Sequence, residues 1–157
     1  LVEKVTITGI GYKYMDVIKW HNNRVVEIEG YSEEEILTER EDIDYDAAGN
    51  ITQTDHYLVE DDVEELSYIV QYEFDDKANP HFEFSDPADL VSFNIDKVCP
   101  NNLVRSSQRA SLDAEPYATT EIEYTYNNSG LPTQRNIQHV LFSSVSDAVE
   151  KIYYKKI

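Results

Sequence analysis

Apolar and polar residues alternate with a period of two along most of this chain. The clearest stretch is 66–74, where one face carries Leu66, Tyr68, Val70, Tyr72 and Phe74 while the other carries Ser67, Gln71 and Glu73. Because successive side chains of a strand point to opposite faces, this pattern predicts strands with one buried face. Strands are predicted at about residues 3–9, 10–19, 24–31, 35–45, 50–59, 64–75, 79–84, 103–112, 118–127, 132–143 and 149–156.

Four similar turn segments, rich in Asn, Asp and Gly, interrupt the alternation. Each follows an aromatic strand, and the copies span residues 18–26, 43–51, 72–80 and 124–132. These residue types tolerate positive φ or hydrogen-bond to their own backbone, so each copy predicts a hairpin. Hairpins repeated in this way predict an all-β chain, an antiparallel β-meander of about 9–11 strands. The twelve tyrosines suit a half-buried sheet face, which favours a sheet curled into an open half-barrel over a dry, closed barrel.

Three places depart from the simple meander. Ser85 or Asp86 followed by Pro87 resembles a helix start, which predicts one short helix near residues 86–94 that plugs the open side of the sheet. The stretch 143–150 is predicted to be a connection with a helical turn. Gly9 and Gly11 predict a bulge or bend that helps the sheet to curl.

Length and charge narrow the class of protein. The 157 residues predict a single domain, 1–157, that needs neither metal nor disulfide, and the single Cys99 is interpreted as a small buried residue. Of the 31 acidic residues, 23 lie between Glu27 and Asp96, where Arg40 and Lys77 are the only bases. A net charge of −18 argues against nucleic acid as a partner, because phosphate contacts need basic side chains. No apolar run approaches the ~20 residues of a membrane-spanning helix, so no transmembrane span is expected.

Asp42, Asp44 and Asp46 imitate a calcium-binding loop, with a carboxylate at every second position. A helix-loop-helix calcium site needs a glycine after the third acid, and Ala47 stands there instead. The alternation with Ile43 favours aspartates that simply face water, and calcium ligation by the three residues is kept as the alternative. The four histidines show no metal-binding spacing, and no cofactor is predicted.

The search for catalytic motifs finds neither a nucleophile elbow nor a phosphate-binding glycine loop, which favours a protein that is not an enzyme. Aromatic residues on a curved sheet can stack on sugar rings, and they can equally form the core of a thin sheet. Both readings apply to six residues, the candidate ligand-binding set of Trp20, Tyr12, Tyr14, Tyr68, Tyr72 and Tyr124.

The turn copies resemble tyrosine–aspartate repeat hairpins. The order of the landmarks 79–82, 101–104 and 124–133 resembles the C-terminal part of an uncharacterised family of secreted lipoproteins from Gram-negative, gut-type bacteria with a porin-like half-barrel fold. The resemblance implies an export signal and a lipidated cysteine upstream of Leu1, and a location in the periplasm or on the outer cell surface. It implies no pore and supplies no catalytic residues.

These observations predict a non-enzymatic exported surface or periplasmic module that binds a ligand or serves a structural role. The partner is unknown, and a protein or glycan of the cell envelope is expected. The alternative is a lipocalin-like carrier that holds a small apolar or glycan ligand on its tyrosine-lined concave face. An open sheet leaves unpaired edges, so an edge-mediated homodimer is also expected.

Overall fold

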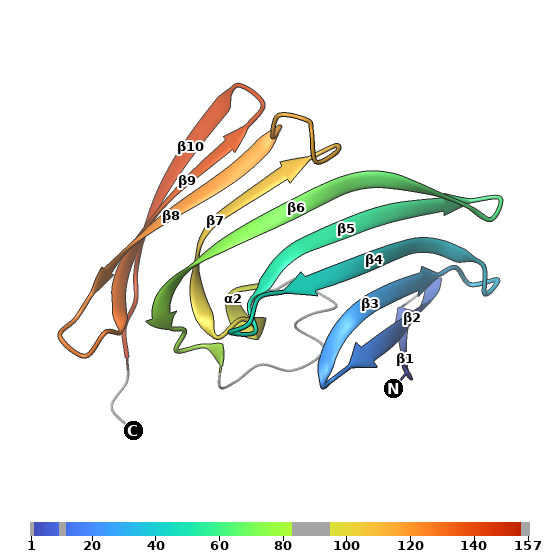
Figure 1. The fold of residues 1–157 in the computed structure, drawn as a ribbon, viewed down its shortest axis with the longest axis horizontal. Helices are drawn as coiled ribbons and strands as arrows, with labels where there is room; N and C mark the ends of the chain where they lie inside the picture. Colours follow the sequence, from blue (N-terminus) through green and yellow to red (C-terminus); the bar gives the residue numbers. More distant parts are fainter. Residues whose placement is uncertain (1, 10–11, 83–94, 155–157) are drawn as a thin grey trace.

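The computed structural model describes residues 2–9, 12–82 and 95–154, and it contains one ten-stranded antiparallel sheet whose strands lie side by side in chain order (Figure 1). The all-β meander predicted from the alternation is confirmed. Its strands are β1 (Val2–Gly9), β2 (Tyr12–His21), β3 (Arg24–Tyr31), β4 (Leu37–Tyr45), β5 (Ile51–Glu60), β6 (Val63–Ala78), β7 (Asn101–Arg109), β8 (Ala118–Tyr126), β9 (Pro132–Leu141) and β10 (Ser144–Lys151).

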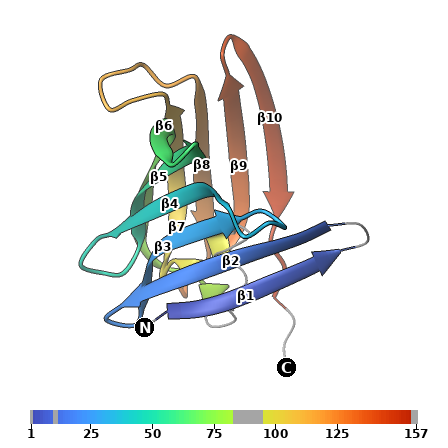
Figure 2. The same cartoon turned by 90° about the vertical axis from the view of Figure 1, so that its right-hand side faces the viewer.

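The sheet is bent and open. Figures 1 and 2 show it arching around the four-residue helix α2 (Ile95–Val98), while β1 and β10 stay apart at its two edges. Across the described ranges, β1 pairs with β2 alone and β10 with β9 alone. We call the face on which α2 packs the inner face and the opposite one the outer face.

The core lies on the inner face, between β2–β5 and α2. Cross-strand register sets its composition, because Ile18 stands opposite Ile28 and side chains of paired residues point the same way. Burying each aliphatic side chain contributes roughly 1.5–3 kcal/mol. Its buried members are Ile18, Val25, Ile28, Ile43, Ile51, Ile95 and Cys99, and the half-buried residues packed against them are Trp20, Tyr45, Tyr72, Phe74, Val98 and Leu103.

Three of the four predicted hairpin turns are present. Asn22 and Asn23 join β2 to β3 with φ of 50° and 62°, the left-handed conformation that asparagine tolerates. The β4–β5 and β8–β9 turns share another design, in which Gly49 and Gly130 take φ of 102° and 75°. In each, the side chain of the leading residue (Asp46 or Asn127) accepts two backbone N–H bonds.

The third copy, 72–80, is not a hairpin, and that prediction is wrong. β6 continues to Ala78, and the next strand, β7, begins only at Asn101. Asp75 accepts the Lys77 N–H at 3.0 Å inside the strand, so the turn-forming residues make a local irregularity in the pairing of β6 with β7. The strand predicted at 79–84 is likewise absent over residues 79–82. Residues 83–94, and with them the helix predicted near 86–94, lie outside the described part of the chain.

The stretch 143–150 is a strand rather than a connection. Phe142, with φ of 52°, makes a tight turn, after which β10 pairs with β9 from Ser144 opposite Leu141 onward. β1 pairs with β2 without a register shift up to Gly9 opposite Tyr12, and Gly11, the other residue of the predicted bulge or bend, lies outside the described part of the chain. Shifts in register occur instead between later strands, for example at Lys19/Trp20 and His56/Tyr57.

The segment that follows α2 is tied beneath the sheet by buried polar groups. Asn50, which is 2% exposed, accepts the Asn101 N–H at 3.0 Å and donates to the Asn101 side chain at 3.0 Å. Its amide also donates to Asp46 at 2.9 Å. The Ile51 N–H donates to the Cys99 sulfur at 3.4 Å. These bonds join the β4–β5 turn to the start of β7.

We expect Asn50→Ala to lower the free energy of unfolding by about 2–3 kcal/mol, because it removes the hydrogen bonds that the buried Asn50 side chain makes with half-buried groups of Asn101 and Asp46. Chemical denaturation followed by circular dichroism would measure the change. Asn128→Ala, in the exposed part of the β8–β9 turn, is the control and should stay within about 0.5 kcal/mol of the wild type. Equal effects of the two substitutions would contradict this account.

Candidate functional site

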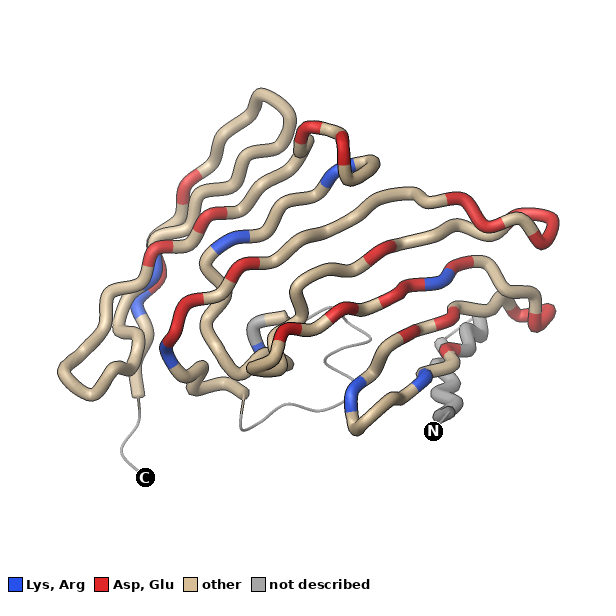
Figure 3. Tube along the Cα trace, viewed as in Figure 1, with Lys and Arg blue, Asp and Glu red and all other residues tan. Residues whose placement is uncertain are grey.

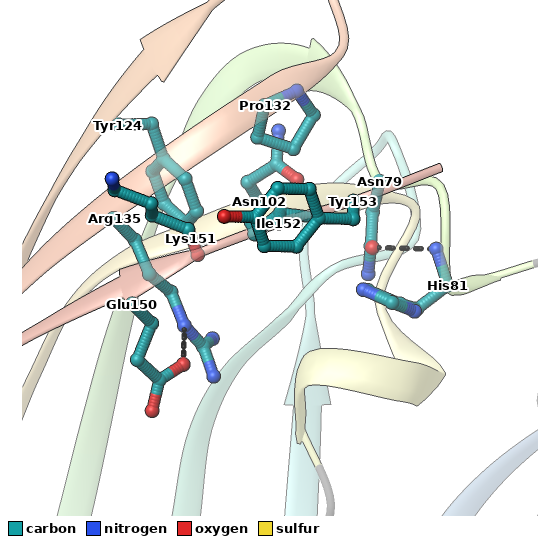
Figure 4. Close-up of a pocket in the computed structure, with 10 residues that line it drawn as sticks. All are labelled: Asn79, His81, Asn102, Tyr124, Pro132, Arg135, Glu150, Lys151, Ile152 and Tyr153. Atoms are coloured by element: carbon teal, nitrogen blue, oxygen red, sulfur yellow. Dashed lines mark hydrogen bonds and ion pairs between the residues drawn. The ribbon is translucent and has the colours of Figure 1, made fainter. Parts of the chain in front are cut away.

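The inner face of β6–β10 carries two adjoining cavities that form the candidate site. One, of about 290 Å³, lies at the end of the sheet where β10 finishes (Figure 4). The other, of about 490 Å³, lies nearer to α2. Both are lined by Arg135 and Glu150, so the two spaces meet at this pair. We call the combined space the inner trough.

The smaller cavity combines aromatic rings with amides and charges. The close-up shows the Tyr153 ring close to Pro132 and Ile152, with Tyr124 on one side of them and Asn79 and His81 on the other (Figure 4). Tyr153 is 84% exposed, so its ring is available to a ligand. The complete lining is Asn79, His81, Asn102, Tyr124, Pro132, Arg135, Glu150, Lys151, Ile152 and Tyr153.

Arg135 and Glu150 face each other across β9 and β10, where the strand register places them directly opposite. Arg135 Nε donates to Glu150 Oε2 at 2.7 Å. The bond holds both side chains at the wall that the two cavities share. The pair therefore places one cationic and one anionic group at the junction of the two cavities.

Internal hydrogen bonds fix the amides of the smaller cavity. Asn102 donates to both carboxylate oxygens of Asp75 at 3.3 Å and lies 3.3 Å from the Tyr126 hydroxyl. Tyr126 in turn donates to Asp75, and burial together with this bond raises the pKa of the Tyr126 phenol. Asn79 donates to the Cys99 carbonyl at 2.8 Å. A rigid polar floor lowers the entropy that a ligand loses on binding.

The larger cavity is more apolar. It is lined by Val70, Tyr72, Ile95, Leu103, Ser106, Thr120, Ile122, Arg135, Ile137, His139 and Glu150. Within it, the Thr120 hydroxyl and His139 Nδ1 form a hydrogen bond of 2.9 Å. A third cavity, of about 470 Å³, lies away from the trough beside the β2–β3 turn.

The six aromatic residues predicted to bind a ligand do not gather in one place. Tyr124 and Tyr72 line the trough, one in each cavity. Trp20 packs against the core, and Tyr68 stacks on His56 with ring centroids 4.6 Å apart. The side chains of Tyr12 and Tyr14 lie outside the described part of the structure.

Most of the polar trough residues carry no local signal in the sequence. Arg135 and Glu150 meet only through the β9–β10 register, and the second of these strands was predicted to begin at residue 149. Asn79 and Asn102 were interpreted as turn or connection residues. Tyr153 follows the last strand. The aromatic residues on the alternating strand faces were the visible signal, and they indicated Tyr72 and Tyr124.

A second group of titratable side chains lies on the inner face of β2–β6. Glu41, which is 6% exposed, has a pKa raised from 4.5 to about 7 because burial penalises its charged form, although Thr54 opposes the rise. His56 Nδ1 lies 3.9 Å from Glu41 Oε2, and its Nε2 lies 4.0 Å from Glu39 Oε2. Burial raises the pKa of Asp16, and the negative charge of Glu39 raises it further. Glu41 and Asp16 therefore hold their protons to higher pH than ordinary carboxyl groups do.

On the outer face, acidic side chains pair with the few bases. Lys19 donates to Glu27 at 2.5 Å and to Glu29 at 2.8 Å. Arg40 binds Asp42 and, at 2.9 Å, Glu64. Many of the other acids lie along β4–β6 and at the β3–β4 and β5–β6 turns, which lie at the same end of the sheet (Figure 3).

The structure separates the three candidate calcium ligands. Asp42 pairs with Arg40, and Asp44 is exposed. Asp46 accepts backbone bonds from Gly49 and Asn50 at 2.7 and 2.9 Å. Within residues 2–9, 12–82 and 95–154, no group of three or more His, Cys, Asp or Glu side chains is placed to hold a metal ion.

Comparison with known proteins finds a likeness to solved structures. A porin-like protein from Bacteroides uniformis matches with a TM-score of 0.46 and 14% sequence identity, over 89% of this chain and 58% of that chain. This chain therefore spans less than two thirds of the length of the protein it matches. No protein-family model and no curated protein sequence matches it. No helix in the described ranges has the length and apolar character needed to cross a membrane.

The raised pKa of Glu41 predicts a pH-dependent loss of stability. A folded carboxyl with a pKa of about 7 holds its proton where the unfolded carboxyl has lost it, so its contribution falls as the pH rises from 4.5 to about 7. We expect Glu41→Gln to raise the free energy of unfolding at about pH 8 by up to ~3 kcal/mol, and to have little effect at about pH 4. Glu123→Gln, at an exposed position, is the control for denaturation at both pH values. A gain for Glu41→Gln that does not depend on pH would contradict the prediction.

Calcium ligation by Asp42, Asp44 and Asp46 is the alternative to aspartates that simply face water, and a thermal-shift measurement tests it. Because Asp46 is engaged in its own turn, we expect millimolar calcium to leave the melting temperature unchanged. A rise in melting temperature that disappears in Asp44→Asn would establish the calcium site instead.

Proposed function

We propose that this domain is a non-catalytic binding module of the cell envelope, and that its inner trough receives a glycan or the polar, ring-containing part of a partner. The supporting observation is the lining of the trough, where exposed aromatic rings, fixed amides and an ion pair converge on one open space. Aromatic faces pack on apolar ring surfaces, and amide and charged groups supply directed hydrogen bonds.

An open trough favours a ligand that extends beyond it. Because β1 and β10 do not pair with each other, the sheet does not close around a ligand as a lipocalin barrel does. A chain such as an oligosaccharide can lie along the trough from Tyr153 to Val70 and leave at either end. This geometry supports the binding module over the carrier.

The carrier remains the second candidate because of the cavity sizes. Volumes of about 290 and 490 Å³ approach or fall within the range of ~300–1,000 Å³ that is typical of small-ligand sites. The apolar lining of the larger cavity, with Val70, Ile122 and Ile137, suits an apolar group. A carrier would bind small monomeric ligands as tightly as longer chains.

The envelope location rests on the order of turn landmarks that resembles secreted lipoproteins. It includes the expectation of an anchor upstream of Leu1. Fractionation of cells that produce the full-length protein, with labelling of surface-exposed protein, would test this part separately from ligand binding.

A glycan array followed by calorimetry tests the binding proposal. We expect binding to oligosaccharides that weakens roughly 2- to 10-fold in Tyr153→Ala, because one exposed aromatic contact contributes about 0.5–1.5 kcal/mol. Phe142→Ala is the matched control, since Phe142 is also exposed, at 75%, but lies at the opposite end of the β9–β10 hairpin. Binding that is equally sensitive to both substitutions, or an array and envelope pull-down with no binder, would overturn the proposal.

A further inference from the structure

The free edge of β10 is fully exposed along its length. All eight residues from Ser144 to Lys151 are exposed on both faces of the strand. Two of them are large apolar side chains that are well exposed, Val145 at 59% and Val149 at 66%. Among the residues that the structure describes, no strand covers this edge.

The backbone groups of alternate residues point away from the sheet. Ile152, directly after the strand, donates its N–H to the Thr133 carbonyl at 2.9 Å, so even-numbered residues face β9. Because antiparallel pairing alternates along a strand, the odd-numbered residues direct their N–H and C=O groups outward. They are Val145, Asp147, Val149 and Lys151, and they present a regular row of unpaired donors and acceptors.

This edge lacks most of the features that keep sheet edges apart. Natural edges carry proline, a bulge or a charge in mid-strand. β10 contains no proline, and its register with β9 runs without a shift from Ser144 to Lys151. Asp147 is its one charged residue before Glu150.

We propose that two copies of this chain form a two-fold dimer in which β10 pairs antiparallel with β10 of the second copy, with the axis at Val149. The inference is independent of the proposed ligand. It rests on the exposed edge and on the placement of charge along it.

The charges select the register. Residues that stand opposite each other across the seam must have side chains on the same face, so their numbers are both odd or both even. The axis therefore passes through a residue. An axis at Asp147 would set two carboxylates face to face, which is destabilising. An axis at Val149 places Asp147 opposite Lys151 of the second copy, and the symmetry repeats this ion pair. It also brings the two exposed Val149 side chains together.

The pairing has a consequence for the trough. A two-fold axis perpendicular to the sheet keeps the inner faces of both copies on the same side. Glu150 and Tyr153 line the trough beside the seam, so the smaller cavities of the two copies would lie next to each other. One continuous surface would then receive a ligand longer than a single trough.

Charge exchange tests the register. In analytical ultracentrifugation from about 10 μM to 1 mM, a range suited to an interface of less than standard size, we expect a reversible dimer. Lys151→Asp should weaken the association at least tenfold, because it opposes two pairs of carboxylates, and Asp147→Lys should do the same. The double variant Asp147→Lys/Lys151→Asp restores the opposite charges and should restore the dimer. Circular dichroism checks that each variant is folded.

Cysteine crosslinking locates the axis. Val149→Cys should form a disulfide-linked dimer under mild oxidation, since the two residues meet at the axis. Asp147→Cys is the matched control, because its two copies would be about 13 Å apart along the strands, too far for a disulfide. Cys99 is fully buried and does not contribute.

Three outcomes would overturn the proposal. The first is a strict monomer at about 1 mM, a concentration at which even weak interfaces associate. The second is a dimer that persists in Val149→Pro, which removes an outward N–H; such a dimer would use another surface. The third is crosslinking of Asp147→Cys as fast as that of Val149→Cys.

Discussion

This single-layer sheet buries the apolar residues of its inner face by bending around the segment that packs there. The other features of the structure depend on this arrangement. Ten strands in chain order supply the bend, and α2 with the segment after it fills the space beneath. That segment stays in place through buried polar bonds, chiefly those of Asn50 to Asn101 and of Asn79 to the Cys99 carbonyl. The same segment therefore packs against the apolar core near β2–β5 and supplies part of the polar floor of the trough.

Local patterns in the sequence were sufficient for most strands and most turns, because alternation and turn chemistry act within a few residues. They failed where distant residues decide. The Asp75–Lys77 run has the composition of a turn, yet β6 pairs with β7 on both sides of it, at Phe74 and at Ala78, and the run stays within the strand. The ion pair of Arg135 with Glu150 depends on the register of β9 with β10, and the exposed, polar β10 gives no alternation by which it could be recognised.

Charge is distributed unevenly between the two halves of the sheet. The acidic residues between Glu27 and Asp96 lie mostly on β3–β6, where several pair with Lys19 and Arg40 on the outer face. The trough lies on the part of the sheet that follows, where Arg135 and Lys151 contribute positive charge. A strongly acidic chain thereby keeps one region in which a neutral or acidic ligand meets little repulsion. The buried Glu41 differs from the other acids of β3–β6, because burial raises its pKa to about 7 and a large share of its carboxyl groups stays neutral near that pH.

Cys99 is the one cysteine of the chain, and its sulfur is fully buried at the junction of α2, β5 and β7, where it accepts the Ile51 N–H. A thiol in this position can react with an alkylating reagent only when the segment beneath the sheet detaches. Its labelling rate in the folded protein therefore reports the free energy of that local opening, separately from global unfolding. Cys99 thus serves as an internal probe of how stably this segment is bound to the inner face of the sheet.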